Sequence, residues 1–263
     1  MKCLRLTVFI AFVLTLALFV VYEDYLSRHA DDTIPTIVFD TDALALPVTS
    51  TEADLLSGVY AYDEKDGDLT DHVIVERVSN FTETGVASVT YAVVDDDLHV
   101  VKARRALHYT DYRAPRFSFH TDMRFEAGAK FNLLDIIGAD DLIDGDISAK
   151  VKLISSELNA SVPGVYKCQA QVTSSMGDVS YLEFNVTIYE AHPQPIRIEL
   201  SEYLVYLNAG DAFDPASYYR GDQSPRIVSG VNTDEPGQYK VYYHLDTPEG
   251  ATGVAELFVI VEE

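Results

Sequence analysis

Apolar and polar residues alternate along three well-separated stretches of the chain. A period of two residues is typical of a β-strand with one buried face. A turn and one more strand-like segment follow each stretch, and after residue 22 no long segment repeats every 3.6 residues. The pattern predicts an all-β protein beyond its N-terminus. The residues expected on the buried faces are Ala87, Val89, Tyr91 and Val93, then Tyr166, Cys168, Ala170 and Val172, then Tyr239, Val241, Tyr243 and Leu245.

The N-terminus has a different pattern, in which a short basic head is followed by 17 uncharged residues. That length is at the short end for a helix that crosses a bilayer, and it is long for the core of a signal peptide. No small-x-small cleavage pattern follows, since the first alanine after the run is Ala30. We therefore predict a cytoplasmic stub at 1–5, a transmembrane anchor at 6–22 and a linker at 23–34, with a cleaved signal peptide as the alternative.

The sequence also repeats itself at a nearly fixed spacing. When it is shifted so that Asp66 falls on Asp144, the whole segment Asp66-Gly67-Asp68 falls on Asp144-Gly145-Asp146; we call this spacing the repeat shift. With one further position added, Gly85-Val86 falls on Gly164-Val165. Because several landmarks recur in the same order, the chain is expected to contain repeated structural units.

A third and shorter copy completes the series. The stretch "EPGQYKVYYHL" (235–245) matches "VPGVYKCQAQV" (162–172). Units of ~75 residues with several short strands have the size of a small β-sandwich. The three predicted units span residues 35–110, 114–190 and 194–263.

The net charge of the chain argues against anionic partners. Residues 23–263 carry 17 basic and 42 acidic side chains, a net charge of −25. That field repels nucleic acid and anionic lipid headgroups, and it attracts cations such as calcium. The simplest role of so much negative charge is to keep an exposed protein soluble. Cys3 lies at the start of the predicted anchor, so it does not form a disulfide framework with the second cysteine, Cys168.

Two acidic turns are the main candidates for chemistry, because carboxylates on a tight loop supply several of the oxygens that calcium takes. An EF-hand is excluded, since its final Glu would fall on Val73. The structural alternative is that glycine supplies a positive φ while aspartate caps the turn. The third copy favours this alternative, because Arg220 replaces the first aspartate. The candidate calcium ligands are Asp63, Asp66, Asp68 and Asp71 in the first turn, and Asp140, Asp141, Asp144 and Asp146 in the second.

Catalytic signatures are missing from the sequence. It has no GxSxG, no HExxH and no Gly-rich phosphate loop, and its seven histidines show no metal-ligand spacing. Cys168 shares a face with apolar neighbours, which predicts a buried and inert thiol. The "RGD" at 220–222 coincides with turn residues of the repeat, which favours a turn over an adhesion motif. We therefore predict a non-catalytic protein whose only candidate cofactor is calcium.

The landmarks of each unit resemble those of tandem bacterial Ig-like surface domains, the group that includes Ig-like modules of pesticidal crystal proteins. These landmarks are an "AGxxF" stretch, an "A-x-D…DGD" turn and a "Pro-Gly-x-Tyr" strand, and the resemblance covers everything beyond the anchor and its linker. The first copy departs from the pattern with Thr84-Gly85, and the third lacks the full acidic turn. No tryptophan is present, so antibody-like domains with a Cys-Trp-Cys core are excluded.

The resemblance implies three tandem Ig-like β-sandwich domains after a single N-terminal transmembrane helix. Because members of the family act as stalks, spacers or adhesive modules, it implies a membrane-anchored spacer or adhesion module at a bacterial cell surface. The region after the anchor is then extracellular. The alternatives are a calcium-dependent module that binds a cell-wall glycan or a protein, an envelope enzyme, and a protein secreted after signal cleavage. The expected partners are the membrane and a glycan or protein ligand, and nucleic acid is not among them.

Overall fold

The computed structural model describes residues 2–29, 33–191, 195–248 and 250–263, with the side chains of the N-terminal helix described from residue 7 to residue 25. The chain divides into two compact units. The first unit comprises residues 1–79 and 86–110, and the second comprises residues 80–85 and 111–263.

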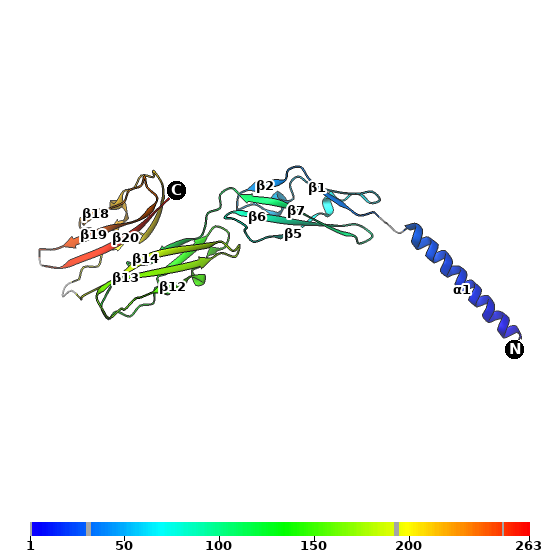
Figure 1. Cartoon of the computed structure of the whole chain (residues 1–263), viewed down its shortest axis with the longest axis horizontal. Coiled ribbons are helices and arrows are strands. Elements are labelled where there is room, and N and C mark those ends of the chain that lie inside the picture. Colours follow the sequence, from blue (N-terminus) through cyan, green and yellow to red (C-terminus); the bar gives the residue numbers. More distant parts are fainter. Residues whose placement is uncertain (1, 30–32, 192–194, 249) are drawn as a thin grey trace. The chain divides into compact units, whose positions relative to one another are not determined.

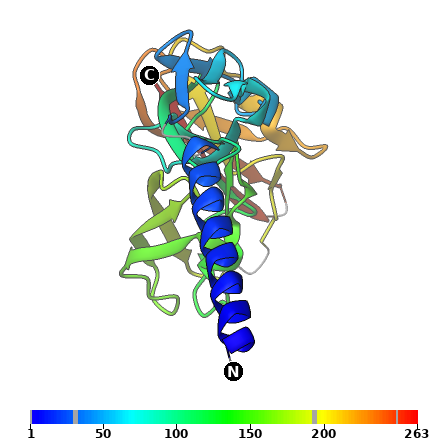
Figure 2. The same cartoon turned by 90° about the vertical axis from the view of Figure 1, so that its right-hand side faces the viewer.

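The N-terminal helix α1 runs from Lys2 to His29 without a break (Figures 1 and 2). Its segment Thr7–Tyr25 is long and apolar enough to cross a membrane, by length and composition, and a signal peptide has the same properties. The helix is longer than the predicted span 6–22 because charged residues such as Glu23 are good helix formers too. Residue 1 of the predicted stub and residues 30–32 of the predicted linker lie outside the described residues.

The first sandwich forms the rest of the first unit (Figure 1). Its elements are β1 (Thr36–Phe39), β2 (Ala43–Leu46), α2 (Glu52–Leu55), β3 (Val59–Asp63), β4 (Gly67–Asp68), η1 (Thr70–His72), β5 (Ile74–Val78), β6 (Val86–Val94) and β7 (Val100–Tyr109). One sheet has the strand order β1-β3-β4 and the other has the order β2-β7-β6-β5. The chain changes sheets between β1 and β2, because β1 pairs antiparallel with β3 whereas β2 pairs parallel with the last strand, β7.

The second sandwich repeats this topology within the second unit. Its elements are β8 (Arg116–Phe119), β9 (Arg124–Glu126), η2 (Leu133–Asp135), β10 (Ile137–Asp141), β11 (Gly145–Asp146), η3 (Ser148–Lys150), β12 (Lys152–Ser156), β13 (Gly164–Thr173) and β14 (Val179–Tyr189). The sheets have the orders β11-β10-β8 and β12-β13-β14-β9. The repeat shift is confirmed from β3 to β5, which it places on β10 to β12, including a β-bulge at Val75/Arg77 that recurs at Leu153/Ser155.

The third sandwich has the same four-stranded sheet and a shorter second sheet. Its elements are β15 (Glu199–Leu200), β16 (Leu204–Asn208), η4 (Pro215–Tyr218), β17 (Tyr219–Arg220), β18 (Arg226–Ser229), β19 (Gly237–Asp246) and β20 (Thr252–Glu262). The sheets have the orders β15-β17 and β16-β20-β19-β18, and β16 again pairs parallel with the last strand. Residue 194, the predicted start of this domain, lies outside the described residues, and the predicted boundaries remain predictions.

The predicted buried faces of the three long strands lie in the cores, with two exceptions. Tyr166 and Tyr239 are only partly buried, because each stands at the beginning of its strand. Each hydroxyl donates to a carbonyl four residues back, Tyr166 to Val162 at 2.8 Å and Tyr239 to Glu235 at 2.9 Å. The tyrosine of the "Pro-Gly-x-Tyr" landmark therefore closes the preceding corner rather than filling the core.

The second and third sandwiches share one continuous hydrophobic core. Phe119 of β8 is the link, since its ring lies 5.4 Å from the ring of Phe184 in its own sandwich and 5.3 Å from that of Phe258 on β20. The contact buries Phe258 although this residue points out of its own sheet. The predicted fold class, all-β with tandem Ig-like β-sandwiches after one N-terminal apolar helix, is confirmed.

Candidate functional site

The acidic turn of the first sandwich is organised by its own carboxylates. Asp63 ends β3 with a buried side chain, and its Oδ1 accepts the backbone N–H groups of Lys65 at 2.8 Å and Asp66 at 3.1 Å. Asp68 Oδ1 accepts the N–H of Thr70 at 2.9 Å, at the start of η1. Hydrogen bonds with Thr70 lower the pKa of Asp68. These aspartates stabilise the turn as local caps.

The acidic turn of the second sandwich uses the same contacts. Asp141 is buried, and its Oδ1 accepts two backbone N–H groups of the turn at 2.9 Å each. Asp146 Oδ1 accepts the N–H of Ser148 at 2.9 Å. The glycine of each turn has a positive φ, +79° at Gly67 and +70° at Gly145, which glycine adopts at little cost.

Asp66 and its counterpart Asp144 join each turn to the opposite sheet. Asp66 Oδ2 accepts the backbone N–H of Asp96, in the hairpin between β6 and β7, at 2.9 Å. Asp144 Oδ2 accepts the N–H of Ser175, in the hairpin between β13 and β14, at 2.6 Å. Hydrogen bonds from Ser175 and Lys150 lower the pKa of Asp144. The aspartate at this position therefore connects the two sheets of its sandwich.

The two remaining candidate ligands do not join these clusters. Asp71 is exposed on η1, and Asp140 forms an ion pair with Arg113 at 2.6 Å. Among the described residues, no group of three or more His, Cys, Asp or Glu side chains is arranged to hold a metal ion. Four of the eight predicted ligands thus have the turn-forming role of the structural alternative, and Asp66 and Asp144 connect the turn to the opposite sheet. Calcium binding stays a prediction.

The two turns differ at the second oxygen of the buried aspartate. Asp141 Oδ2 accepts the hydroxyl of Tyr112 at 2.8 Å, and burial together with this carboxylate raises the pKa of Tyr112. In the first sandwich the strand register makes Thr36 the counterpart of Arg116, so the counterpart of Tyr112 is Asp32, which lies outside the described residues. Asp63 Oδ2 has no hydrogen-bond partner within the described part of the chain. Motif reading missed Tyr112, because it lies outside the Asp-Gly-Asp turn.

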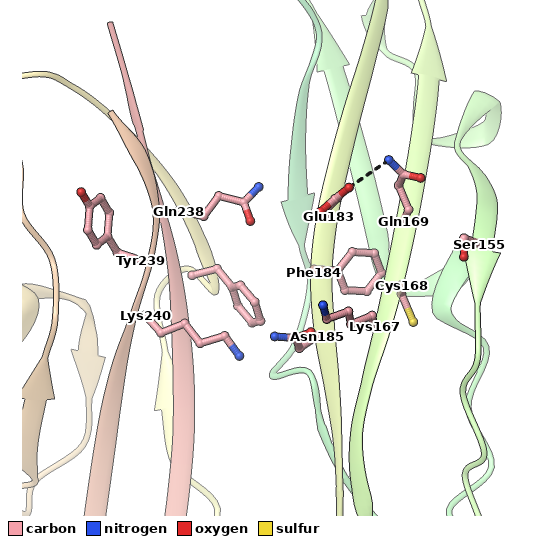
Figure 3. Close-up of a pocket in the computed structure, with 11 residues that line it drawn as sticks. Ser155, Lys167, Cys168, Gln169, Glu183, Phe184, Asn185, Gln238, Tyr239 and Lys240 are labelled. Carbon is pink, nitrogen blue, oxygen red and sulfur yellow. Dashed lines mark hydrogen bonds between the residues drawn. The ribbon is translucent and has the colours of Figure 1, made fainter. Parts of the chain in front are cut away.

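A cleft of about 590 Å³ lies between the second and third sandwiches of the second unit. One wall is the outer face of β13 and β14, and the other wall is formed by β19 and β20 (Figure 3). These faces are polar because period-two strands direct every second side chain away from the core. The side chains that project into the cleft in Figure 3 are Lys167, Gln169, Glu183, Asn185, Gln238 and Lys240.

The cleft offers hydrogen-bond donors and acceptors that the described part of the chain does not use. Within the described residues, Lys167, Asn185 and Gln238 make no side-chain hydrogen bond or ion pair. Figure 3 shows Lys167, Asn185 and Lys240 directed towards the same part of the cleft. An acceptor is also present, since the carboxylate of Glu183 accepts a long hydrogen bond of 3.4 Å from Gln169. The arrangement suits a ligand with many hydroxyl groups, because each hydroxyl both donates and accepts.

A buried ion-pair network fixes the two walls of the cleft. Glu256 on β20 is 2% exposed. Its Oε1 accepts from Arg124 of β9 at 3.1 Å, and its Oε2 accepts from Lys240 at 2.9 Å. The Lys240 ammonium also lies 4.5 Å from the centroid of the Phe258 ring, a cation–π contact. Lys240 therefore belongs both to the cleft wall and to the contact between the sandwiches.

A second carboxyl group, Asp122, lies beside Glu256. The backbone N–H of Glu256 is 3.4 Å from Asp122 Oδ1. Burial raises the pKa of Asp122 to about 8, and the neighbouring Glu256 carboxylate adds to the rise. Arg124 and Lys240 oppose it. At neutral pH Asp122 is therefore mainly protonated, and its proton prevents repulsion between the two carboxyl groups.

Cys168 and the "RGD" segment do not form a reactive centre. The thiol of Cys168 is buried, as predicted, and burial raises its pKa, which keeps it in the unreactive form. Arg220 ends β17 and Asp222 lies in the bend that follows, and both residues are exposed. The Arg220 guanidinium donates to the carbonyl of Ser217 at 3.1 Å, so it takes part in the turn.

The fold and the cleft thus define the class of this protein. It consists of tandem Ig-like β-modules after an N-terminal apolar helix, with a polar cleft in the second unit. The sequence is 27% identical over 213 residues to the pesticidal crystal protein Cry22Aa of Bacillus thuringiensis. The match covers 76% of this chain and 29% of that protein, so the chain spans less than a third of its relative. No protein-family model matches.

The solved structures that match the chain do so with low TM-scores. The CBM51-2 and INT domains of Clostridium perfringens ZmpB, solved in complex with GlcNAc, share 19% sequence identity, cover 56% of this chain and 26% of that one, and give a TM-score of 0.25. Drosophila N-cadherin EC1-4 shares 11% identity, covers 89% and 76% of the two chains and gives a TM-score of 0.23. The predicted resemblance holds to this extent: the protein is β-rich and Ig-like, and no particular group is singled out.

Proposed function

We propose that this protein is a non-catalytic, membrane-anchored binding module of a bacterial cell surface, and that the cleft of the second unit binds a glycan. The observation that carries the proposal is a set of polar groups in the cleft without a partner among the described residues, Lys167, Asn185 and Gln238. A glycan matches this wall because its hydroxyl groups satisfy amides, ammonium groups and a carboxylate together. The ion pair of Arg124 with Glu256 supports the proposal by holding the walls at a fixed separation.

The glycan test uses residues 31–263. The side chains of α1 that the structure describes, those of residues 7–25, are exposed and none belongs to the buried core, so this fragment keeps all three sandwiches. The fragment is mixed with insoluble peptidoglycan and with an array of oligosaccharides, and retention is measured. We expect retention that a Lys167→Ala/Asn185→Ala/Gln238→Ala variant loses. Lys152→Ala, an exposed position outside the cleft, is the control.

Two outcomes separate this proposal from its alternatives. Retention of the parent and the cleft variant in equal amounts would place the ligand elsewhere. A complete lack of retention would instead favour a spacer without a ligand. The same fragment is expected to be silent in a screen of hydrolase substrates, because we propose no catalytic role.

The proposed anchor has its own test. In cells, an uncleaved α1 keeps the full chain in the membrane fraction after alkaline washing, since the largely apolar segment Thr7–Tyr25 partitions strongly into the bilayer. A shortened chain in the medium would identify α1 as a signal peptide and overturn the anchor, while leaving the binding proposal intact.

A further inference from the structure

The outer face of the four-stranded sheet in the first sandwich carries a row of basic residues. Arg77 of β5, Thr90 of β6 and Arg104 of β7 are direct neighbours in the strand register. Thr90 is only 5% exposed and forms the floor of a groove of about 470 Å³. Lys102 lies on the same face and pairs with Glu76. The groove therefore carries three basic groups and one acidic group.

Two of these basic groups have no partner among the residues that the structure describes. Arg77 and Arg104 are exposed, and in the described part of the chain their guanidinium groups form no ion pair or hydrogen bond. Their strands are two steps apart, so the side chains start ~10 Å from each other, on either side of Thr90. Such a pair is unexpected where residues 23–263 carry a net charge of −25. Arginine binds carboxylates through two parallel hydrogen bonds, and two arginines offer two such sites.

The third sandwich has an equivalent outer face, which is covered by protein. Register pairs Tyr91 with Ala103 in the first sandwich and Tyr243 with Ala255 in the third, which aligns Arg104 with Glu256. The two tyrosines occupy the same place, since each hydroxyl donates at 2.6 Å to a carbonyl near the short helix of its own sandwich, that of Leu55 or Pro215.

At the aligned position of the third sandwich the face is covered by protein. Glu256 is 2% exposed and binds Arg124, which lies on the edge strand β9 of the second sandwich. Phe258, on the same face, meets the ring of Phe119 from edge strand β8 at 5.3 Å. An acidic centre on this face thus docks a protein edge that presents a basic residue.

At the position that corresponds to Glu256 the first sandwich carries the opposite charge, that of Arg104. We propose that the outer face of β5, β6 and β7 is a docking surface for a protein edge that presents carboxylates, which Arg77 and Arg104 bind. The charge complementarity is the reverse of that between Glu256 and Arg124. Ala106 replaces Phe258 at the aligned position, so this interface relies more on charge and weakens with salt. The surface is separate from the glycan cleft of the second unit.

The test uses residues 31–263 and two probes. The protein-like probe is the extended peptide (Glu-Thr)6, with (Gln-Thr)6 as its uncharged control, and the glycan probe is alginate, whose carboxylates are carried by sugars. Binding is followed by NMR shifts of the Thr90 amide and its neighbours. We expect (Glu-Thr)6 to bind at low salt, to lose at least fivefold in affinity at high salt, and (Gln-Thr)6 not to bind.

A matched pair of variants locates the surface. Arg77→Gln/Arg104→Gln is expected to abolish the shifts, whereas Arg226→Gln/Lys152→Gln, which removes the same charge from exposed positions of the second unit, leaves them unchanged. Equal loss in both variants would show a general charge effect and overturn the proposal. Binding of alginate but not the peptide at these residues would assign the face to an acidic glycan instead. No binding of either probe at millimolar concentration would also overturn it.

Discussion

Arg124 on β9 and Glu256 on β20 form an ion pair at 3.1 Å between two sandwiches, although the residues stand 132 positions apart in the chain. Removing one partner of a buried pair is costly, because the other charge is left without compensation. We expect Glu256→Gln to lower the free energy of unfolding of the second unit by roughly 3 kcal/mol in urea denaturation, the lower end of the usual range. The expected loss is at the lower end of that range because the adjacent carboxyl group of Asp122 can ionise in place of Glu256.

A control for this prediction is built into the repeat. Glu183 occupies the position of Glu256 in the second sandwich, since Ala170 pairs with Leu182 as Tyr243 pairs with Ala255. Glu183 is exposed, so Glu183→Gln is expected to change stability by less than about 0.5 kcal/mol. Equal effects of the two substitutions would show that the buried network does not stabilise the second unit.

The pH dependence of the second unit follows from Asp122. Its pKa is about 8 in the folded chain against an ordinary value of 3.8, so between these values the folded state holds a proton that the unfolded state has released. Stability is therefore highest below pH 3.8 for this group and falls as pH rises, by up to about 1.4 kcal/mol per pH unit, until pH passes about 8. Asp122→Asn should remove this component.

The measurement is urea denaturation of parent and variant at several pH values. The difference between the two curves isolates Asp122, because the Glu256 carboxylate keeps its partners Arg124 and Lys240 in the variant. A difference that stays constant between pH 5 and pH 8 would contradict the raised pKa of Asp122.

Tyr112 gives a prediction that concerns the second acidic turn. Tyr112→Phe leaves the buried Oδ2 of Asp141 without its donor, and an unsatisfied buried acceptor costs about 1–3 kcal/mol. Thermal unfolding should show the second unit destabilised by this amount. Tyr181→Phe, at an exposed position of the same sandwich, is the control and should be neutral. A neutral Tyr112→Phe would mean that water satisfies Asp141.

The repeat made most of the fold predictable from the sequence. The repeat shift and the period-two strands led to the three sandwiches, because both signals depend on local spacing. The docking of the third sandwich on the second could not be predicted in this way. It depends on Phe258 and Glu256 on an outward face, and alternation alone would place such residues in water. The burial of Glu256 is explained only by the structure, which shows its partner Arg124.

The candidate site, like the fold, was predicted from the sequence only in part. The turn role of the aspartates was expected, because Asp-Gly-Asp has a known local chemistry and the third copy does without it. The cleft was not expected, since its walls come from strands far apart in sequence and its residues, such as Lys167 and Gln238, belong to no motif. Local patterns predict turns and strands, whereas a groove between sandwiches requires their docking to be known.

The acidic turns allow a last prediction, which separates their structural role from calcium binding. Asp63→Ala removes the acceptor of two backbone N–H groups and should lower the stability of the first sandwich by about 1–3 kcal/mol, whether or not calcium is present. Asp71→Ala, at an exposed position of the same loop, should be neutral. If the carboxylates serve the turn alone, adding calcium leaves the melting temperature unchanged and releases no heat in calorimetric titration. A rise in melting temperature that Asp66→Asn/Asp68→Asn removes would instead establish a calcium site, because those carboxylates would then bind the ion as well as the turn.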